Sequence, residues 1–436
     1  MNERTLADKI ANKKARVGII GLGYVGLPLA VTFAKGGFPT YGFDINKDRL
    51  KRVKKGESYI LDVAVKELKQ VIGSRKLRVA DDFSEIKKLD VIIICVPTPL
   101  KEKSEPDVSY IVSAVENIKR FMKKGQLVVL ESTTYPGTTE EIILPMLESA
   151  GFKEGEDFYL AFSPERVDPS NVKYKTENTP KVIGGISPQS TNISKLLYSK
   201  VIKKVVPASS AKVAEMSKLL ENTFRIVNIA LVNEIMLMCD KLGVDVWEVI
   251  DVAKTKPYGF MPFYPGPGVG GHCIPVDPIY LSWKAKGYGF EARFIEWASY
   301  INSHMPHYVV ERITRALNEY KKPLKGSKIL VVGVAYKKDV KDLRESPALE
   351  IIKILQNEQA RVSYYDPYLP YLNIDNIDLK NVKFNRVNFS DTDCVVVVTD
   401  HSNVDYEFIL RYSPLIIDTR NVFKSCKGRK DKVVKL

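Results

Sequence analysis

The chain has 436 residues, which is too long for one ordinary domain and predicts two or three. Its content of 45% hydrophobic and 27% charged residues is typical of a soluble globular protein, and its net charge is +14. The basic residues are spread along the whole chain without a recognition motif. We therefore interpret the charge as solvated surface, or as attraction for a polyanionic substrate such as a nucleotide sugar, and expect no nucleic-acid partner.

The cysteines and apolar stretches narrow the class of protein further. An odd, dispersed set of five cysteines with no C-x-x-C pair argues against a disulfide framework and a zinc ribbon, and fits a reducing cytosol. The N-terminus has no apolar signal-peptide core, and the most apolar long stretch, residues 226–239, is too short and too polar to span a bilayer. The four histidines have no metal-ligand spacing. These features predict a cytoplasmic protein without a metal site or membrane segment.

Residues 1–208 alternate strand-like and helix-like patterns. The expected strands are residues 16–21, 40–44, 90–96, 127–131 and 158–162, and an apolar-periodic helix is expected over 25–35. Continuous apolar runs are typical of strands that are buried on both faces of a parallel sheet. This part of the chain is therefore predicted to be a doubly wound, Rossmann-like α/β domain.

The pattern changes at residue 209. Residues 211–242 have a period near 3.6 with no Gly or Pro, which predicts one helix of about 48 Å. A second helix is expected over 294–318. Residues 209–318 are thus predicted to be a central helical domain, whose long spine helix suggests a homodimer or a higher homo-oligomer.

The α/β alternation resumes at residue 328. Strands are expected at residues 328–333, 361–366, 394–399 and 415–418. Residues 319–436 are therefore predicted to be a second Rossmann-like, doubly wound domain.

A glycine motif follows the first expected strand. Its sequence is Gly21-Leu22-Gly23-Tyr24-Val25-Gly26, and Asp44 ends the next strand about 20 residues on. Such glycines allow a tight turn and backbone contact to a pyrophosphate at a helix N-terminus. Asp44 would accept hydrogen bonds from the adenosine ribose and repel a 2′-phosphate, which favours NAD over NADP, although the nearby Arg49 tempers this preference. The alternative is a structural glycine turn without a dinucleotide.

Two further turns follow sheet strands. Pro97 and Thr98 come after one strand, and Ser132 and Thr133 come after the next. The carboxyl ends of such strands form the ligand crevice, so these residues are expected to face the nicotinamide half of the cofactor. Ordinary turn chemistry with a capping hydroxyl is the alternative at each position.

Cys273 lies in a loop rich in glycine and proline, residues 265–277, which ends at Asp277. Glycines let backbone approach a ligand closely, and prolines stiffen the loop. A thiol in such a loop, together with a dinucleotide motif, suggests an oxidation that passes through a covalent intermediate.

A set of motifs in this order resembles one known family. The motifs are Gly21–Gly26, Ser132-Thr133, Ser163-Pro164-Glu165, Lys218 with Asn222, Gly270–Cys273 with Asp277, and Tyr336–Asp339 with Arg344–Pro347. Together they resemble the UDP-glucose/GDP-mannose dehydrogenase family over roughly residues 15–425. Within it, residues 131–140 and 264–283 are most similar to UDP-N-acetylhexosamine 6-dehydrogenases, especially the N-acetylglucosamine type.

The resemblance implies an activity and catalytic roles. The family oxidises a sugar C6 alcohol to a carboxylate in two NAD-dependent steps, and Cys273 would hold the C6 aldehyde as a thiohemiacetal and then as a thioester. The implied supporting residues are Lys218 and Asn222 for the oxyanion, Asp277 as base or water ligand, Glu165 for thioester hydrolysis, and Thr133 to position a water. Without the resemblance, Lys218 reads as a solvated helix residue, Glu165 as a local cap and Asp277 as a helix N-cap.

The resemblance also implies binding residues. Lys337 would contact the UDP phosphates, and Arg344 would reach the cofactor. The remaining implied substrate residues are Arg166 and, in the loop that would wrap the uridine and sugar, Phe263, Tyr264, Gly270 and Gly271. His272 is expected to be structural or to line the substrate.

One stretch departs from the UDP-glucose-specific pattern. Those members carry an arginine well before the catalytic cysteine, whereas residues 256–260 here contain none. The departure argues against UDP-glucose and supports a sugar that bears a 2-acetamido group, but it does not separate the gluco from the manno epimer. The expected substrate is UDP-N-acetylglucosamine, and UDP-N-acetylmannosamine or UDP-glucose remain the alternatives. A non-enzymatic nucleotide-binding protein is disfavoured because every candidate catalytic side chain is present. The usual use of such a product is the supply of surface-polysaccharide precursors.

Overall fold

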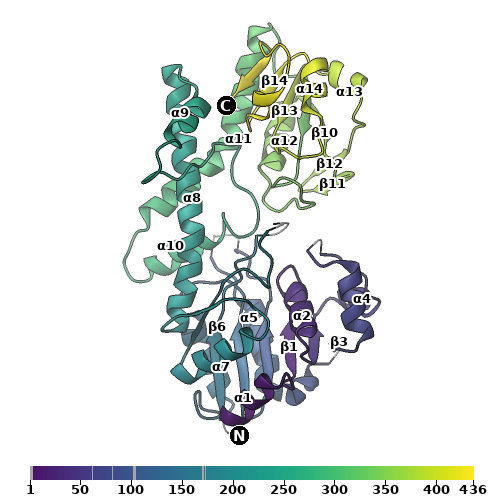
Figure 1. The fold of residues 1–436 in the computed structure, drawn as a ribbon. Helices are drawn as coiled ribbons and strands as arrows, with labels where there is room; N and C mark the ends of the chain where they lie inside the picture. The colour runs from purple at the N-terminus through teal and green to yellow at the C-terminus, as the bar shows by residue number, and fades with distance from the viewer. Residues whose placement is uncertain (1–2, 61, 81, 102–104, 169–170, 172) are drawn as a thin grey trace. The chain divides into compact units, whose positions relative to one another are not determined.

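The computed structural model describes residues 3–60, 62–80, 82–101, 105–168, 171 and 173–436. The chain divides into two compact units, which are described separately here (Figure 1). The first unit contains Met1–Glu221 and Ile279–Phe290, and the second contains Asn222–Pro278 and Glu291–Leu436. Two helices, α8 (Ala211–Leu242) and α10 (Asp277–Lys286), continue from one unit into the other.

The first unit is built on an eight-stranded sheet in the order β3-β2-β1-β4-β5-β6-β7-β8. Its strands are β1 (Val17–Ile20), β2 (Thr40–Phe43), β3 (Leu77–Val79), β4 (Val91–Ile94), β5 (Gln126–Leu130), β6 (Phe158–Phe162), β7 (Lys181–Gly185) and β8 (Val205–Pro207). Pairing is parallel except between β6 and β7, which run antiparallel. The first six strands have the order of a dinucleotide-binding fold.

Both faces of this sheet are covered by helices. Alternate residues of β1 enter opposite cores: Val17 and Ile19 pack in one cluster with Phe33 of α2, and Ile20 packs in the other with Val115 of α5. The helices of this unit are α1 (Glu3–Ala11), α2 (Gly26–Lys35), α3 (Lys47–Lys54), α4 (Val65–Gly73), α5 (Ser109–Phe121), α6 (Leu144–Glu148) and α7 (Pro188–Tyr198), with the short turns η1 (Phe83–Lys88) and η2 (Thr139–Ile143). Burial on both faces explains the continuous apolar strands of the sequence.

The second unit contains a five-stranded parallel sheet in the order β10-β9-β13-β14-β15. Its strands are β9 (Lys328–Val332), β10 (Arg361–Tyr365), β13 (Cys394–Val397), β14 (Ile416–Asp418) and β15 (Val433–Lys435). A separate hairpin joins β11 (Tyr371–Ile374) to β12 (Ile377–Lys380). Its two loop residues, Asp375 and Asn376, both have positive φ, as a two-residue hairpin turn requires.

The helices of the second unit include the long α11. They are α9 (Val246–Ala253), α11 (Arg293–Glu319), α12 (Pro347–Asn357), α13 (Arg386–Ser390) and α14 (Tyr406–Tyr412), with the 3₁₀ turn η3 (Val422–Ser425). Ile226 and Ala230 of α8 pack against Ala298 of α11 in a small apolar cluster. Within the described residues, no helix is both long enough and apolar enough to cross a membrane.

The predicted fold class is confirmed: along the chain, a Rossmann-like α/β sheet is followed by a helical part with a long spine helix and then by a second Rossmann-like sheet. Each predicted strand is present within a few residues of its expected bounds, and the helix predicted over 211–242 has those bounds. The sequence analysis missed six strands and the antiparallel direction of β7, in addition to the position of α10. The missed strands are β3, β7, β8, β11, β12 and β15.

Candidate functional site

The glycine motif forms the turn between β1 and α2. Gly21 has φ +92°, and a Cβ there would lie 2.5 Å from the Cys95 carbonyl oxygen, while a Cβ on Gly26 would lie 1.8 Å from the Gly21 carbonyl oxygen. Packing within the protein therefore requires glycine at both positions. Gly23 differs, because a Cβ there would meet no described atom within 4 Å. Its lack of a side chain is explained by the close approach of a ligand to the loop, as a pyrophosphate at the N-terminus of α2 requires.

Asp44 follows β2 and faces this turn. Its carboxylate accepts hydrogen bonds from the backbone N–H groups of Leu22 at 2.9 Å and Asn46 at 2.8 Å, and Arg49 lies 3.5 Å away. Tyr59 donates to the Leu22 carbonyl at 2.6 Å, and burial followed by the charge of Asp44 raises the pKa of Tyr59 to about 12. Asp44 is thus held beside the glycine turn, where a dinucleotide-binding fold places the ribose. Tyr24 of the motif is about half exposed.

The ends of β4 and β5 are tied together beside the glycine turn. Thr98 donates its hydroxyl proton to the Thr133 carbonyl at 2.7 Å, and Ser132 donates to the Val96 carbonyl at 2.7 Å. Pro97 is exposed next to them. The predicted residues of the nicotinamide side are therefore adjacent, at the carboxyl edge of the sheet where α/β folds bind ligands.

Glu165 follows β6 and is held by several donors. Its carboxylate accepts from the backbone N–H groups of Arg166 and Val167, and Lys181 of β7 lies 3.1 Å away. Burial raises the pKa of Glu165, but Lys181 and the two N–H groups together lower it by more, so the net shift of this pKa is downward. Arg166 itself forms an ion pair with Glu221 of α8 at 2.7 Å. Lys218 lies on the same helix and is largely buried.

Cys273 lies in the second unit, four residues before α10 begins at Asp277. The Asp277 N–H donates to the Cys273 carbonyl at 2.9 Å, which closes the turn that leads into the helix, and the cysteine is exposed. Asp277 is buried and accepts a hydrogen bond of 2.5 Å from the Asn222 amide of α8. The structure thus joins two of the predicted catalytic residues and places the thiol four residues before one of them.

The loop that leads to Cys273 is anchored by buried amides. Asn233 of α8 accepts from the Gly266 N–H at 2.9 Å and donates to Asn302 of α11 at 2.9 Å. A Cβ on Gly266 would lie 2.7 Å from a guanidinium nitrogen of Arg420. Phe263 contacts Phe224, and Tyr264 stacks on Trp247. The sequence analysis did not identify Asn233, whose only signal was a polar residue that interrupts an apolar helix face.

The same loop packs against the segment that carries Lys337 and Arg344. The Gly271 N–H donates to the Arg344 carbonyl at 2.9 Å, and Cβ atoms on Gly270 and Gly271 would lie 2.8 Å from the Tyr336 side chain. Burial and then the positive charge of Arg344 lower the pKa of His272. The predicted substrate residues Lys337, Gly270 and Gly271 are therefore brought into one neighbourhood with Cys273.

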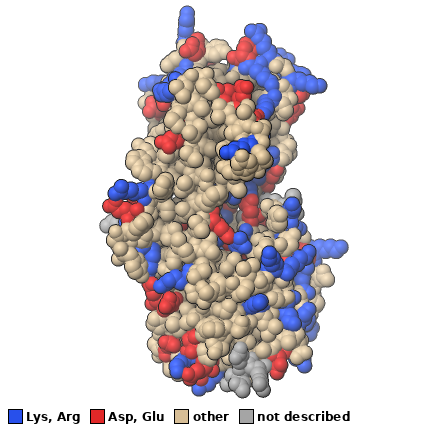
Figure 2. All heavy atoms as spheres, turned by 60° about the vertical axis from the view of Figure 1, so that its left-hand side comes forward, with Lys and Arg blue, Asp and Glu red and all other residues tan. Residues whose placement is uncertain are grey.

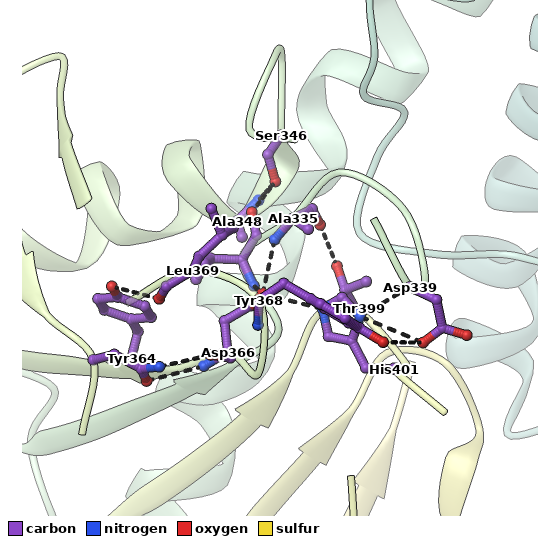
Figure 3. Close-up of polar contacts among 12 residues, drawn as sticks. Ala335, Asp339, Ser346, Ala348, Tyr364, Asp366, Tyr368, Leu369, Thr399 and His401 are labelled. Carbon is purple, nitrogen blue, oxygen red and sulfur yellow. Dashed lines mark hydrogen bonds and ion pairs between the residues drawn. The ribbon is translucent and has the colours of Figure 1, made fainter. Parts of the chain in front are cut away.

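A buried polar cluster, drawn in Figure 3, makes hydrogen bonds to the backbone of the segment that carries Lys337. Asp366, at the end of β10, accepts from the N–H groups of Val334 and Ala335 and from His401 at 3.0 Å. The other imidazole nitrogen of His401 accepts from the Asp339 N–H at 3.0 Å. Because Nδ1 accepts in this pattern, Nε2 is the nitrogen that donates to Asp366. The backbone around Lys337 is consequently held by groups that the sequence analysis did not select.

The predicted residues fall into two groups. Cys273, Asn222, Asp277, Lys337, Arg344 and the loop 263–271 belong to the second unit, whereas the glycine motif, Asp44, Thr133, Glu165, Arg166 and Lys218 belong to the first. An approach of Lys218, Glu165 or Thr133 to the thiol, and of Arg344 to the cofactor, stays a prediction. No cluster of metal-ligating side chains occurs among the residues that the structure describes.

Comparison with known families covers most of the chain. Residues 15–202 match the NAD binding domain of the UDP-glucose/GDP-mannose dehydrogenase family, residues 212–304 its central domain, and residues 330–425 its UDP binding domain. The glycine turn described above lies within the first match, and the Lys337 segment lies within the third. The Asp44 carboxylate and the open space at Gly23 fit NAD.

Individual relatives are similar over nearly their full length. The UDP-N-acetyl-D-mannosamine dehydrogenase of Pyrococcus horikoshii is 38% identical over 416 residues, which are 94% of this chain and 96% of that protein. The UDP-N-acetyl-D-glucosamine 6-dehydrogenase of Pseudomonas aeruginosa is 38% identical over 359 residues, 82% of this chain and 84% of that protein. The solved structure of UDP-D-ManNAc dehydrogenase from Pyrococcus horikoshii has a TM-score of 0.87 and 36% identity, and it covers 96% of this chain and 98% of that one.

Proposed function

The chain belongs to the UDP-glucose/GDP-mannose dehydrogenase family, and from this premise we propose that it is a UDP-N-acetylhexosamine 6-dehydrogenase with Cys273 as its nucleophile. The family membership makes it an NAD-dependent UDP-sugar dehydrogenase. The observation that supports the nucleophile is an exposed cysteine just before α10, in a loop that packs against the segment carrying Lys337.

The proposed chemistry oxidises one carbon twice. The C6 alcohol loses a hydride and a proton to give an aldehyde, and the Cys273 thiol adds to it to form a thiohemiacetal. Loss of a second hydride from C6 and of the hydroxyl proton gives a thioester, which water hydrolyses to a carboxylate, a proton and the free thiol. Bound NAD supplies the acceptor for each hydride. Two NADH and one uronate are therefore formed for each sugar.

The chain's own residues would assist at defined atoms. Asn222 and Asp277, joined by their hydrogen bond, are proposed to bind the oxyanion and the hydrolytic water, respectively. Lys218, four residues before Asn222 on α8, is proposed as the second oxyanion donor, with Glu165 and Thr133 ordering the water. Lys337 is proposed for the UDP phosphates. Phe263, Tyr264, Arg166, Gly270 and Gly271 are proposed for the uridine and sugar, and Arg344 for the cofactor.

UDP-N-acetylglucosamine is the first proposed substrate, and UDP-N-acetylmannosamine is the second. The absence of arginine from residues 256–260 supports a 2-acetamido sugar over UDP-glucose. Relatives that carry each of the two acetamido-sugar names are equally identical to this chain, at 38%. The product would serve surface-polysaccharide synthesis, and the five free thiols suit a cytoplasmic location.

A substrate panel tests this proposal. Each of the three UDP-sugars is incubated with NAD, and NADH and product are counted for each sugar consumed. Two NADH per acetamido sugar are expected, and Cys273→Ser should abolish complete turnover. A single NADH per sugar, an aldehyde product, or full activity of Cys273→Ser would contradict the mechanism.

We also propose the domain boundaries near residues 208 and 318 and a homodimer formed through α8 and α11. In the second unit these helices expose large apolar side chains: Phe224, Leu231, Met238, Leu242, Phe294, Trp297 and Tyr300. Figure 2, which turns the α8 side of Figure 1 forward, shows a broad area with few charged residues. Exposed apolar patches of this kind mark protein interfaces. Sedimentation of wild type and Trp297→Glu tests the proposal, with a monomer expected for the variant.

A further inference from the structure

Glu165 is held by a buried set of charges whose other members have no role in the function proposed above. Its Oε1 accepts from the N–H groups of Arg166 at 2.8 Å and Val167 at 2.7 Å, and its Oε2 lies 3.1 Å from the Lys181 ammonium. An ionised carboxylate oxygen has two lone-pair positions. Among the described contacts, Oε1 uses both and Oε2 uses one, so the position that remains for a water is on Oε2, beside Lys181.

Lys181 is itself held by a second carboxylate. It opens β7 with a side chain that is only 4% exposed, and its ammonium lies 2.7 Å from Glu131, whose side chain is fully buried at the end of β5. Tyr198 of α7 donates its hydroxyl proton to the other oxygen of Glu131 at 2.5 Å. Side chains from β7, α7 and the end of β5 therefore hold the ammonium of Lys181, which lies between the carboxylates of Glu131 and Glu165.

The charges in this set give the two carboxylates different pKa values. Burial lowers the pKa of Lys181, but Glu131 and Glu165 raise it by more, so the ammonium stays charged. Burial raises the pKa of Glu131 more than Lys181 lowers it. For Glu165 the same effect of burial is outweighed by Lys181 and two N–H groups, so that its pKa is lowered. The two carboxylates that share one cation therefore differ in pKa, and that of Glu165 is the lower.

We propose that Lys181 is a positioning residue of the hydrolytic step: it fixes the orientation and charge of the Glu165 carboxylate, and Glu131 with Tyr198 fixes Lys181. The inference rests on the proposed function, in which Glu165 orders the water that attacks the Cys273 thioester. Glu165 then acts as a fixed anionic acceptor for that water. Lys181 touches neither the substrate nor the reacting atoms in this scheme.

The test separates hydride transfer from hydrolysis. In Lys181→Met the first turnover should still release about two NADH per site in a rapid burst, because both oxidations precede hydrolysis, and the steady-state rate should fall by about 30-fold. The values of kcat/KM for NAD and the UDP-sugar should change by less than about threefold, because they report the steps before hydrolysis, and each KM should fall together with kcat. Lys181→Arg, which keeps the charge, should recover much of the rate. Lys203→Met, an exposed lysine of the same unit, is the matched control.

The pH profile gives a readout that a purely structural role would not move. Loss of the cation in Lys181→Met should shift the acidic limb of kcat upward by about one pH unit. Glu131→Gln removes the competing anion and should shift the limb in the opposite direction. The double variant Lys181→Met/Glu131→Gln leaves the same net charge as wild type, so it guards against failure of the single variant to fold.

Two outcomes overturn the inference alone. One is a folded double variant with the wild-type steady-state rate, because that variant lacks the contact that orients Glu165 even though its two charge effects offset each other. The other is a limb that shifts in the same direction in Glu131→Gln as in the Lys181 variant. If wild type releases no NADH from any UDP-sugar, the proposed function itself fails, and the two failures are therefore distinguishable.

Discussion

The two sheets of this protein open with the same parallel pair of strands but use the residue after the second strand for different purposes. Both begin with a strand, a glycine at positive φ and a second strand that ends in aspartate. A Cβ on Gly21 would lie 2.5 Å from the Cys95 carbonyl oxygen, and one on Gly333 would lie 2.3 Å from the Thr399 carbonyl oxygen. The first glycine of each turn is therefore required by the fold itself.

The two turns differ in the hydrogen bonds that Asp44 and Asp366 accept. Asp44 accepts one N–H from the glycine turn, through Leu22, and the turn continues with Gly23, whose position leaves room for a ligand. Asp366 accepts from four donors: the two N–H groups of its turn and His401 on one oxygen, and the Tyr368 N–H on the other. The first aspartate is available to a ribose, whereas the second is a structural anchor. A Rossmann-like fold alone therefore does not identify a dinucleotide site.

The largest expected effect is on stability. Asp366→Ala leaves two buried N–H groups and an imidazole N–H without their acceptor, and should lower the free energy of unfolding of the second sheet by about 3 kcal/mol. Asp44→Ala, the matched change in the first sheet, should cost about 1 kcal/mol. Hydrogen exchange in urea, read separately at β9 and β1, measures each sheet. Equal losses in the two sheets would remove the distinction.

The pH dependence of stability should show the anchoring role of Asp366. Burial raises the pKa of Asp366, but His401 and the N–H groups hold it below the usual value. A carboxyl whose folded pKa is depressed stabilises above the unfolded pKa of about 3.9 and loses this contribution as the pH falls through the folded pKa. The stability difference between wild type and Asp366→Ala should therefore be constant from about pH 5 to 8 and shrink below about pH 4.

The sequence could predict what depends on local periodicity and spacing. Apolar runs identified the central strands of both sheets, an unbroken 3.6-residue period set the bounds of α8, and the glycine spacing placed the cofactor turn. The strand β7 was missed because it opens with a charged lysine and ends in two glycines, which resemble a turn. The β11–β12 hairpin was missed because its Asp375-Asn376 turn lacks the usual glycine.

The supports of the site could not be predicted for a different reason. Lys181 and Glu131 are 50 residues apart, and Asp366 and His401 are 35 apart. Each of these four residues is a single polar residue within an apolar stretch of sequence, and no spacing in the sequence links it to its partner. Only tertiary packing, which brings strand ends together, shows that these residues form pairs.

A smaller effect is expected on cofactor binding. Asp44→Ala removes the acceptor beside the glycine turn and should raise the KM for NAD by about tenfold, or about 1.4 kcal/mol, because a charged hydrogen bond to the ribose is lost. The KM for the UDP-sugar should not change. Steady-state kinetics with each ligand varied in turn provide the measurement. An unchanged KM for NAD would mean that Asp44 serves the turn alone, as Asp366 does.

The smallest expected effect distinguishes the two nitrogens of His401. Its Nδ1 accepts from the Asp339 N–H, on the segment that carries Lys337, and its Nε2 donates to Asp366. A glutamine amide reaches the position of Nε2 but leaves Asp339 without an acceptor, whereas an asparagine amide can replace Nδ1 but not the donor to Asp366. His401→Gln should therefore raise the KM for the UDP-sugar by about threefold with little change in kcat, because the lysine segment loosens. His401→Asn should leave that KM nearly unchanged and instead lower stability by about 1 kcal/mol, the cost of one hydrogen bond to Asp366. If both variants change only stability, the polar cluster of the second sheet anchors the fold without orienting the segment that carries Lys337. The second sheet would then use its aspartate for structure alone, whereas the first sheet uses Asp44 for a ligand.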